Sequence, residues 1–119
     1  MLFEMRTYTC KAGKMPEQHE IYVTYGQAAQ VKHLGQPVMF AKAETGLLET
    51  YVHIWVYEDQ ADRQRKRESM LADPDFQEYR NRFLASGNMV QMESRLFNSV
   101  PFFPDAGRNE MLRKPVGAD

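Results

Sequence analysis

The sequence predicts a single α+β domain with the element order β-α-β-β-α-β. Two kinds of pattern support this fold class. Three stretches alternate side chains as strands do, at residues 2–10, 49–57 and 89–97. A shorter apolar stretch, residues 38–44, is predicted to be a fourth strand. Two longer stretches with apolar side chains at helical spacing follow the first and the third strand. This order is typical of the ferredoxin-like fold, in which helices cover one face of an antiparallel sheet.

The first helical segment is predicted to begin at Pro16 and to end before Gly35. Proline suits the first turn of a helix, where no intrahelical partner exists for a backbone N–H, and glycine commonly follows the last turn. Gly26 weakens the middle of this segment by about 1 kcal/mol relative to alanine. We therefore expect a kink or a break near Gly26.

The second helical segment is predicted to begin after Asp59, whose side chain can cap it, and to break at Asp73–Pro74. Asp73 then caps a further helix, which Gly87 ends. The basic run Arg63–Arg67 has acidic neighbours on both sides. We expect this run to form a solvated helix face with i,i+4 ion pairs.

The third strand divides into an aliphatic face and an aromatic face. Val52, Ile54 and Val56 alternate with four rings that each carry a polar group, namely Tyr51, His53, Trp55 and Tyr57. We expect the aliphatic set to face the helices and the aromatic set to lie on the opposite side of the sheet. Soluble proteins seldom expose a large aromatic patch. We therefore predict a homodimer in which two sheets close face to face around polar-aromatic cavities, and the sequence leaves larger assemblies open.

Composition limits the classes of function. The 119 residues fit one domain, residues 1–104, and a polar tail, residues 105–119, that we expect to dock on the domain or on a partner subunit. A net charge of −1 predicts no nucleic-acid partner, and no apolar run approaches the roughly 20 residues of a membrane helix. The single cysteine, Cys10, excludes an intramolecular disulfide. We expect a cytoplasmic protein with no membrane partner.

Six segments of the sequence occur in the order and at the spacing found in one known family. They are Glu4–Thr9, Lys32–Gly35, Val52–Tyr57, Ala61–Arg63, Asp73–Phe76 and Glu93–Leu96. Together they resemble the NIPSNAP family over residues 2 to about 104. The resemblance implies a dimeric α+β barrel domain. It implies no particular reaction, because the family has no agreed activity and the wider superfamily includes oxygenases, haem-degrading enzymes, isomerases and small-ligand binders.

Arg6, Arg95 and Glu93 are predicted to share the polar-aromatic face of the sheet. Two guanidinium groups on such a face can bind a carboxylate, phosphate or enolate oxygen in bidentate fashion, which makes both arginines candidate catalytic residues. The same side chains, together with Glu4, also suit an internal salt-bridge network that orders the dimer interior. Because the charges nearly balance, we favour the network.

His53 is the best candidate for a catalytic base, because aromatic and cationic side chains surround it on the predicted cavity face. In this hypothesis Tyr8 and Trp55 stack on a flat substrate, and Tyr51 completes the lining. The alternative is an aromatic inner layer in which His53 forms a hydrogen bond with a neighbouring side chain.

The remaining histidines carry weaker signals. His33 precedes the glycine that ends the first helical segment, so we favour a capping role for it over a place on the cavity rim. His19, His33 and His53 show no spacing typical of metal ligands, and no phosphate-binding or dinucleotide-binding motif is present. We expect neither a tightly bound metal nor a cofactor.

These observations lead to two hypotheses. In the first, the homodimer binds a small aromatic or enolisable molecule in its cavity, and proton transfer or cofactor-independent oxygenation takes place with His53 as base and Arg6 or Arg95 stabilising an oxyanion. In the second, the dimer is a non-catalytic interaction or structural module with a packed interior. The sequence leaves turnover open. A cavity of a few hundred Å³ would favour the first hypothesis.

Overall fold

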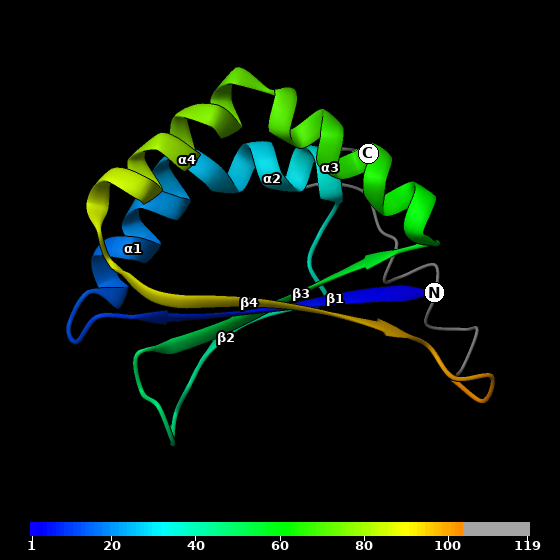
Figure 1. Cartoon of the computed structure of the whole chain (residues 1–119), viewed down its shortest axis with the longest axis horizontal. Coiled ribbons are helices and arrows are strands. Elements are labelled where there is room, and N and C mark those ends of the chain that lie inside the picture. Colours follow the sequence, from blue (N-terminus) through cyan, green and yellow to red (C-terminus); the bar gives the residue numbers. More distant parts are fainter. Residues whose placement is uncertain (104–119) are drawn as a thin grey trace.

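The computed structural model describes residues 1–103 and contains an antiparallel four-stranded sheet with helices on one of its faces (Figure 1). The elements are β1 (Leu2–Cys10), α1 (Met15–Ile21), the π-helical turn η1 (Tyr22–Gly26), α2 (Gln27–Leu34), β2 (Met39–Lys42), β3 (Thr50–Tyr57), α3 (Gln60–Ala72), α4 (Pro74–Ser86) and β4 (Met89–Asn98). The strand order in the sheet is β2-β3-β1-β4. The predicted α+β class and ferredoxin-like element order are confirmed, whereas the tail, 105–119, lies outside the described residues.

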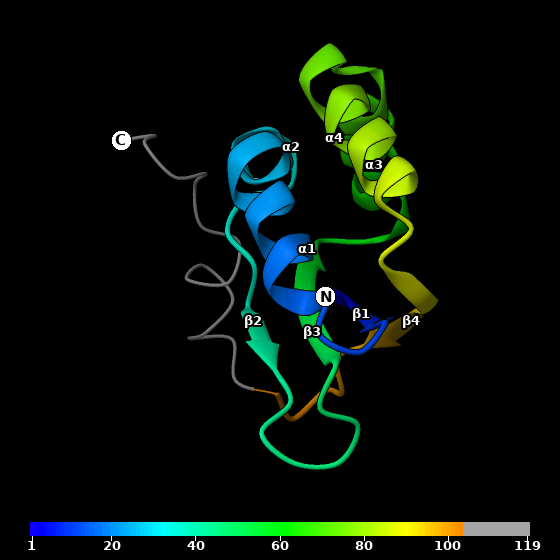
Figure 2. The ribbon, with the colours of Figure 1, turned by 90° about the vertical axis from the view of Figure 1, so that its left-hand side faces the viewer.

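The helices form one layer above the sheet, made of two rods that lie side by side, α1–η1–α2 and α3–α4. Figure 2 shows α1 and α2 over β2 and β3, with α3 and α4 on the side of β1 and β4. The first rod is continuous but contains the π-helical turn η1, which ends at Gly26, the position where the sequence predicts a kink. Gly35, with φ 81°, closes α2 in a backbone conformation that favours glycine. Within residues 1–103, no helix combines the length and the hydropathy needed to cross a membrane.

Two aspartates cap the second rod as predicted. The Asp59 side chain accepts a hydrogen bond from the backbone N–H of Asp62 at 2.8 Å, and the Asp73 side chain accepts one from Asp75 at 2.9 Å. Pro74 occupies the first turn of α4, where its missing N–H costs nothing, and Gly87 ends this helix in the left-handed region with φ 66°. These local signals position α3 and α4 as separate helices.

The face of the sheet that the helices cover is the aromatic one. Directly opposed residues of an antiparallel pair present their side chains to the same face, and Glu4 opposes Trp55 while Arg6 opposes His53. Trp55 and Tyr57 are fully buried beneath the helices. Their grouping on one face is as predicted, but the prediction that this face points away from the helices is wrong.

The physical reason is that each buried ring finds a partner for its polar group. Tyr57 donates a hydrogen bond from its hydroxyl to Glu4 at 3.0 Å, and Trp55 donates one from its indole N–H to His53 at 2.6 Å. Large rings fill the depth between sheet and helices better than valine does, and the satisfied polar groups remove the cost of burying them. The aliphatic set is left on the open face of the sheet.

The prediction is also wrong about which residues of β4 share a face with Arg6 and Tyr8 of β1. Ser94 opposes Arg6 and Met92 opposes Tyr8, so these two β4 residues lie on the helix side. Glu93 and Arg95 alternate with them and therefore lie on the open face. The predicted grouping of Arg6 with Glu93 and Arg95 is wrong.

Candidate functional site

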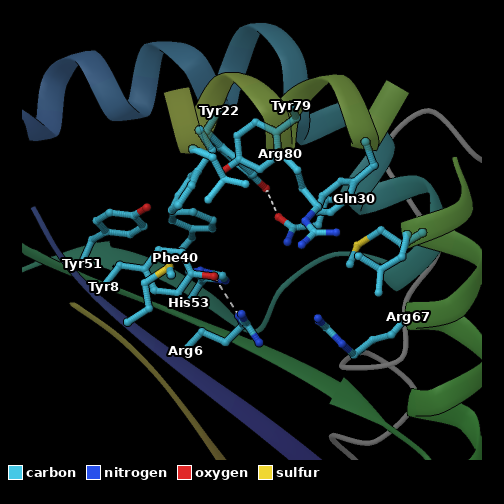
Figure 3. Close-up of a pocket in the computed structure, with 16 residues that line it drawn as sticks. Arg6, Tyr8, Tyr22, Gln30, Phe40, Tyr51, His53, Arg67, Tyr79 and Arg80 are labelled. Atoms are coloured by element: carbon cyan, nitrogen blue, oxygen red, sulfur yellow. Dashed lines mark hydrogen bonds between the residues drawn. The ribbon is translucent and has the colours of Figure 1, made fainter. Parts of the chain in front are cut away.

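A cavity of about 230 Å³ lies between the sheet and the helices (Figure 3). The sheet contributes its floor, with Arg6 and Tyr8 from β1, Phe40 from β2, and Tyr51 and His53 from β3. The helices contribute its roof, which includes Tyr22 of η1, Gln30 of α2, Arg67 of α3, and Tyr79 and Arg80 of α4. The cavity thus lies within one chain, whereas the sequence placed it between two sheets.

His53 is held in one tautomer by Trp55. An indole N–H can only donate, so Nδ1 of His53 accepts the 2.6 Å hydrogen bond with its lone pair. The neutral imidazole then carries its proton on Nε2, which takes part in none of the hydrogen bonds found among residues 1–103. Since His53 lines the cavity, Nε2–H is available as a donor to a bound molecule.

Burial keeps His53 neutral. Desolvation, reinforced by the charge of Arg6 and opposed by that of Glu4, lowers the pKa of His53 to about 3. A group with so low a pKa is a weak proton acceptor at neutral pH. The geometry therefore favours a hydrogen-bond donor at this position over the predicted general base.

Glu4 is a fully buried carboxylate at the base of the site. Arg63 donates to both of its oxygens, at 3.2 and 3.0 Å, Arg6 donates at 2.8 Å, and Ser94 donates at 2.7 Å. Burial acts to raise the pKa of Glu4, but these hydrogen bonds and the nearby positive charges lower it to about 2. Glu4 is thus ionised and its acceptor sites are occupied.

The basic run on α3 is only partly a solvated face. Lys66 pairs with Asp62 at 3.0 Å, as the i,i+4 prediction requires. Arg63 and Arg67 instead point toward the sheet and approach Glu4 at 3.0 and 4.0 Å, which corrects the prediction for these two residues. The sequence contains a pattern that indicates this orientation. Residues 63, 67 and 70 share one face of the helix, and Met70 on that face is buried.

The buried phenols of the cavity are neutral. Burial raises the pKa of Tyr22, Tyr51 and Tyr79 far above the physiological range. Tyr22 donates a hydrogen bond from its hydroxyl to Oε1 of Gln30 at 2.6 Å, and Tyr8 accepts a hydrogen bond from Nε of Arg6 at 2.9 Å. These rings supply flat surfaces and fixed dipoles, whereas the arginines supply charge.

Four of the eight candidate site residues from the sequence analysis line the cavity. Arg6, Tyr8, Tyr51 and His53 line the cavity, and Trp55 lies beneath it as the partner of His53. The other three do not join the site. Glu93 and Arg95 form an exposed ion pair at 2.7 Å on the open face. His33 binds Asp73 at 2.8 Å and ties α2 to the junction of α3 and α4.

Sequence reasoning missed the roof of the cavity. Arg67, Arg80, Tyr22, Tyr79 and Gln30 reach the site only because the helices fold over the aromatic face. A partial signal was present, because Phe76, Tyr79 and Phe83 recur at helical spacing and Arg80 follows Tyr79 directly on the same helix. Among residues 1–103, His, Cys, Asp and Glu side chains form no group of three or more that is suited to a metal ion.

The NIPSNAP family model matches residues 3–104. The chain belongs to the NIPSNAP family. It is 37% identical over 94 residues to a NipSnap homologue of Dictyostelium discoideum. This match covers 79% of the chain and 40% of that relative, so the chain spans less than half of the length of the curated protein that it matches.

Solved NIPSNAP structures share the fold over almost their whole length. A NIPSNAP domain protein from Burkholderia xenovorans is 32% identical, with a TM-score of 0.80 over 88% of this chain and 100% of that one. An antibiotic biosynthesis monooxygenase of known structure is 14% identical, with a TM-score of 0.59 over 85% of this chain and 100% of that one. At that identity, the second likeness shows the fold alone.

Proposed function

We propose that this NIPSNAP domain binds a small aromatic or enolisable organic molecule in the cavity between its sheet and its helices. The observation that carries the proposal is the cavity of about 230 Å³, since a packed interior would leave no such space. A cavity of about 150 Å³ suffices for benzene. The volume therefore suits a molecule of one or two rings, smaller than the occupants of most drug-binding sites.

The lining favours flat ligands with a polar edge. Phe40 stacks on His53 with ring centroids 4.7 Å apart, and Tyr8 meets the same imidazole edge-on at 5.0 Å. These rings present apolar faces, while Nε2–H of His53 and the guanidinium groups provide donors around them. This combination of few polar groups among many rings is typical of small-molecule sites.

The chemistry that suits this cavity begins from a substrate that ionises readily. Among the described lining residues there is no carboxylate, and His53 is a donor. In the catalytic form of the proposal, proton transfer or oxygenation by molecular oxygen proceeds from an enolate whose oxygen accepts the hydrogen bond from Nε2 of His53. Arg6 keeps its predicted role as a positive charge beside that oxygen, and Arg95 has none in the cavity.

A binding screen with a steric plug tests the proposal. Flat aromatics, quinones and small aromatic acids are added to the wild type and to Met92→Trp, in which a half-exposed lining residue on β4 becomes large enough to enter the cavity. A ligand at 100 times its Kd raises stability by about 2.7 kcal/mol, which shifts Tm by several degrees. The shift should disappear in Met92→Trp.

The matched control is Gln91→Trp, which places the same ring one position away on the open face of β4. It should retain the shift. If no compound stabilises the wild type, or if both tryptophan variants keep the shift, the cavity is not the binding site.

We further propose that a second copy of the chain covers the open face of the sheet. Within residues 1–103 no helix covers this face, and its central positions are apolar: Phe3, Met5, Val52, Ile54 and Val56. A self-complementary apolar surface is suited to a two-fold dimer. The dimer proposed here therefore uses the aliphatic face, and the aromatic cavity stays within each subunit.

A further inference from the structure

We propose that the cavity selects an anion, and that its ligand is a one- or two-ring aromatic acid whose carboxylate binds Arg67 and Arg80. This inference rests on the proposed function and names the chemical class of its ligand. The supporting observations are an excess of positive charge in the cavity wall and the separation of its charged part from its aromatic part.

The excess of charge follows from the number of groups around Glu4. Arg6, Arg63 and Arg67 all approach this one carboxylate, which leaves two positive charges uncompensated. Arg80, an exposed residue of α4 that lines the cavity, adds another, and it takes part in none of the salt bridges among residues 1–103. A cavity wall with such an excess stabilises a negatively charged ligand.

Glu4 has no capacity left to bind Arg67 more closely. A carboxylate offers about four lone-pair sites, and Glu4 accepts five hydrogen bonds from Tyr57, Arg63, Arg6 and Ser94. Arg67 remains 4.0 Å away, beyond hydrogen-bond distance. The N–H groups of its guanidinium are therefore available to an incoming oxyanion.

The position of the arginines sets the orientation of the ligand. In Figure 3, Arg67 extends from α3 toward Arg6, and Arg80 descends from α4, whereas Tyr8, Phe40 and Tyr51 occupy the opposite part of the cavity. A planar guanidinium matches the two oxygens of a carboxylate. An aromatic acid would thus place its carboxylate among the arginines and its ring against Phe40 and Tyr8.

Calorimetric titration with matched pairs of probes tests the inference. The pairs are 2-naphthoate with 2-naphthamide and benzoate with benzamide, which differ in charge and scarcely in shape. The wild type should bind the acid at least about tenfold more tightly than the amide, because a hydrogen bond to a charged group contributes more than one to a neutral group. Arg67→Met should lose this preference and keep its affinity for the amide.

The control is Arg65→Met on the same helix. Arg65 is largely exposed and pairs with Asp62, so its removal changes the charge of the chain equally without touching the cavity. This variant should retain the tenfold preference, and a thermal melt of each variant verifies that it is folded.

Three outcomes would overturn the inference, and they can be told apart. Equal affinity for acid and amide would overturn the anion selectivity and leave the proposed binding function standing. Equal loss of selectivity in Arg67→Met and Arg65→Met would show that only the overall charge matters. Failure of every acid, amide and neutral aromatic to bind would overturn the proposed function as well.

Discussion

Two buried ionisable residues of the cavity region, Glu4 and His53, take opposite charge states because their partners differ. Glu4 is surrounded by N–H and O–H donors, so its ionised form is stabilised and its pKa falls to about 2. His53 is also buried, and burial together with the charge of Arg6 stabilises its neutral form, so its pKa falls to about 3. Burial disfavours the charged form of both residues, and only Glu4 has the hydrogen-bond donors and positive charges that overcome it.

The low pKa of His53 predicts a loss of stability in mild acid. The unfolded chain takes up a proton near pH 6.5, and the folded chain does so only near pH 3, so the stabilisation is complete above pH 6.5 and is lost as the pH falls toward 3. Between pH 7 and pH 5 the loss amounts to about 2 kcal/mol.

Urea unfolding of the wild type and of His53→Asn at these two pH values measures this effect. Asparagine can accept the hydrogen bond from Trp55 but does not titrate, so the variant should lose about 2 kcal/mol less than the wild type between the two pH values. His19 also has a lowered pKa and is present in both proteins, so it cancels in the comparison. An identical loss in both proteins would contradict the assignment.

The saturated network around Glu4 predicts a strong effect of removing its charge. Glu4→Gln leaves Arg6 and Arg63 without their anion and should destabilise the fold by about 3 kcal/mol at pH 7. The low pKa of Glu4 also predicts how this effect depends on pH. The ionised Glu4 stabilises the fold fully above pH 4.5, and this contribution to the free energy of unfolding is lost as the pH falls toward 2.

The matched control is Glu93→Gln, which removes the same charge from the exposed pair with Arg95. Exposed ion pairs contribute at most about 1 kcal/mol, so this variant should be close to the wild type in urea unfolding. If Glu93→Gln destabilises the fold as much as Glu4→Gln, the assignment of the two carboxylates to a buried and an open face is wrong.

At the scale of elements, the π-helical turn η1 and the helix α4 are fitted to each other. A Cβ added at Gly26 would lie 2.7 Å from the ring of Tyr79, closer than side chains tolerate. Tyr79 lines the cavity, so the glycine allows α4 to approach and bring this ring over the sheet. The helix irregularity thus helps to shape the roof of the site.

This packing predicts that Gly26→Ala is destabilising although alanine is the better helix former. The overpacking should cost about 1–3 kcal/mol, which exceeds the gain of about 1 kcal/mol in helix propensity. In a Tyr79→Ala background the clash is absent, so the same substitution should be neutral or stabilising. A double-mutant cycle in urea measures this change of sign, and equal effects in both backgrounds would contradict it.

At the scale of the whole molecule, the sheet separates two surfaces with different roles. The covered face carries the cavity. The open face carries half-buried apolar side chains that no helix of residues 1–103 covers, with Val56 buried and Phe3 packed edge-on against Phe103 at 5.9 Å. A homodimer through the open face would bury these side chains without touching the cavity.

The dimer proposal predicts a specific effect of charge on the open face. We expect the wild type to sediment as a dimer at micromolar concentration and Ile54→Glu to sediment as a monomer, because Ile54 lies opposite Met5 and Met39 at the centre of this face. Val23→Glu, at an exposed position of η1, should remain a dimer. A wild type that sediments as a monomer at this concentration would contradict the proposal.

The sequence by itself determined the parts of the fold that depend on neighbouring residues. Capping by Asp59 and Asp73, the break at Pro74 and the irregularity near Gly26 follow from interactions within a few residues, and all are present. The alternation along β3 likewise determined that His53 and Trp55 share a face. The family was also recognisable from short motifs.

Only the tertiary structure decided which face the helices cover and which charges meet there. Alternation has a period of two and is unchanged when a strand is turned over, so it cannot distinguish the covered face from the open one. That choice depends on partners far away in the sequence, such as Arg63 for Glu4. Such contacts between residues far apart in the sequence also decide that Arg67 and Arg80 line the cavity, whereas Glu93 and Arg95 lie on the open face.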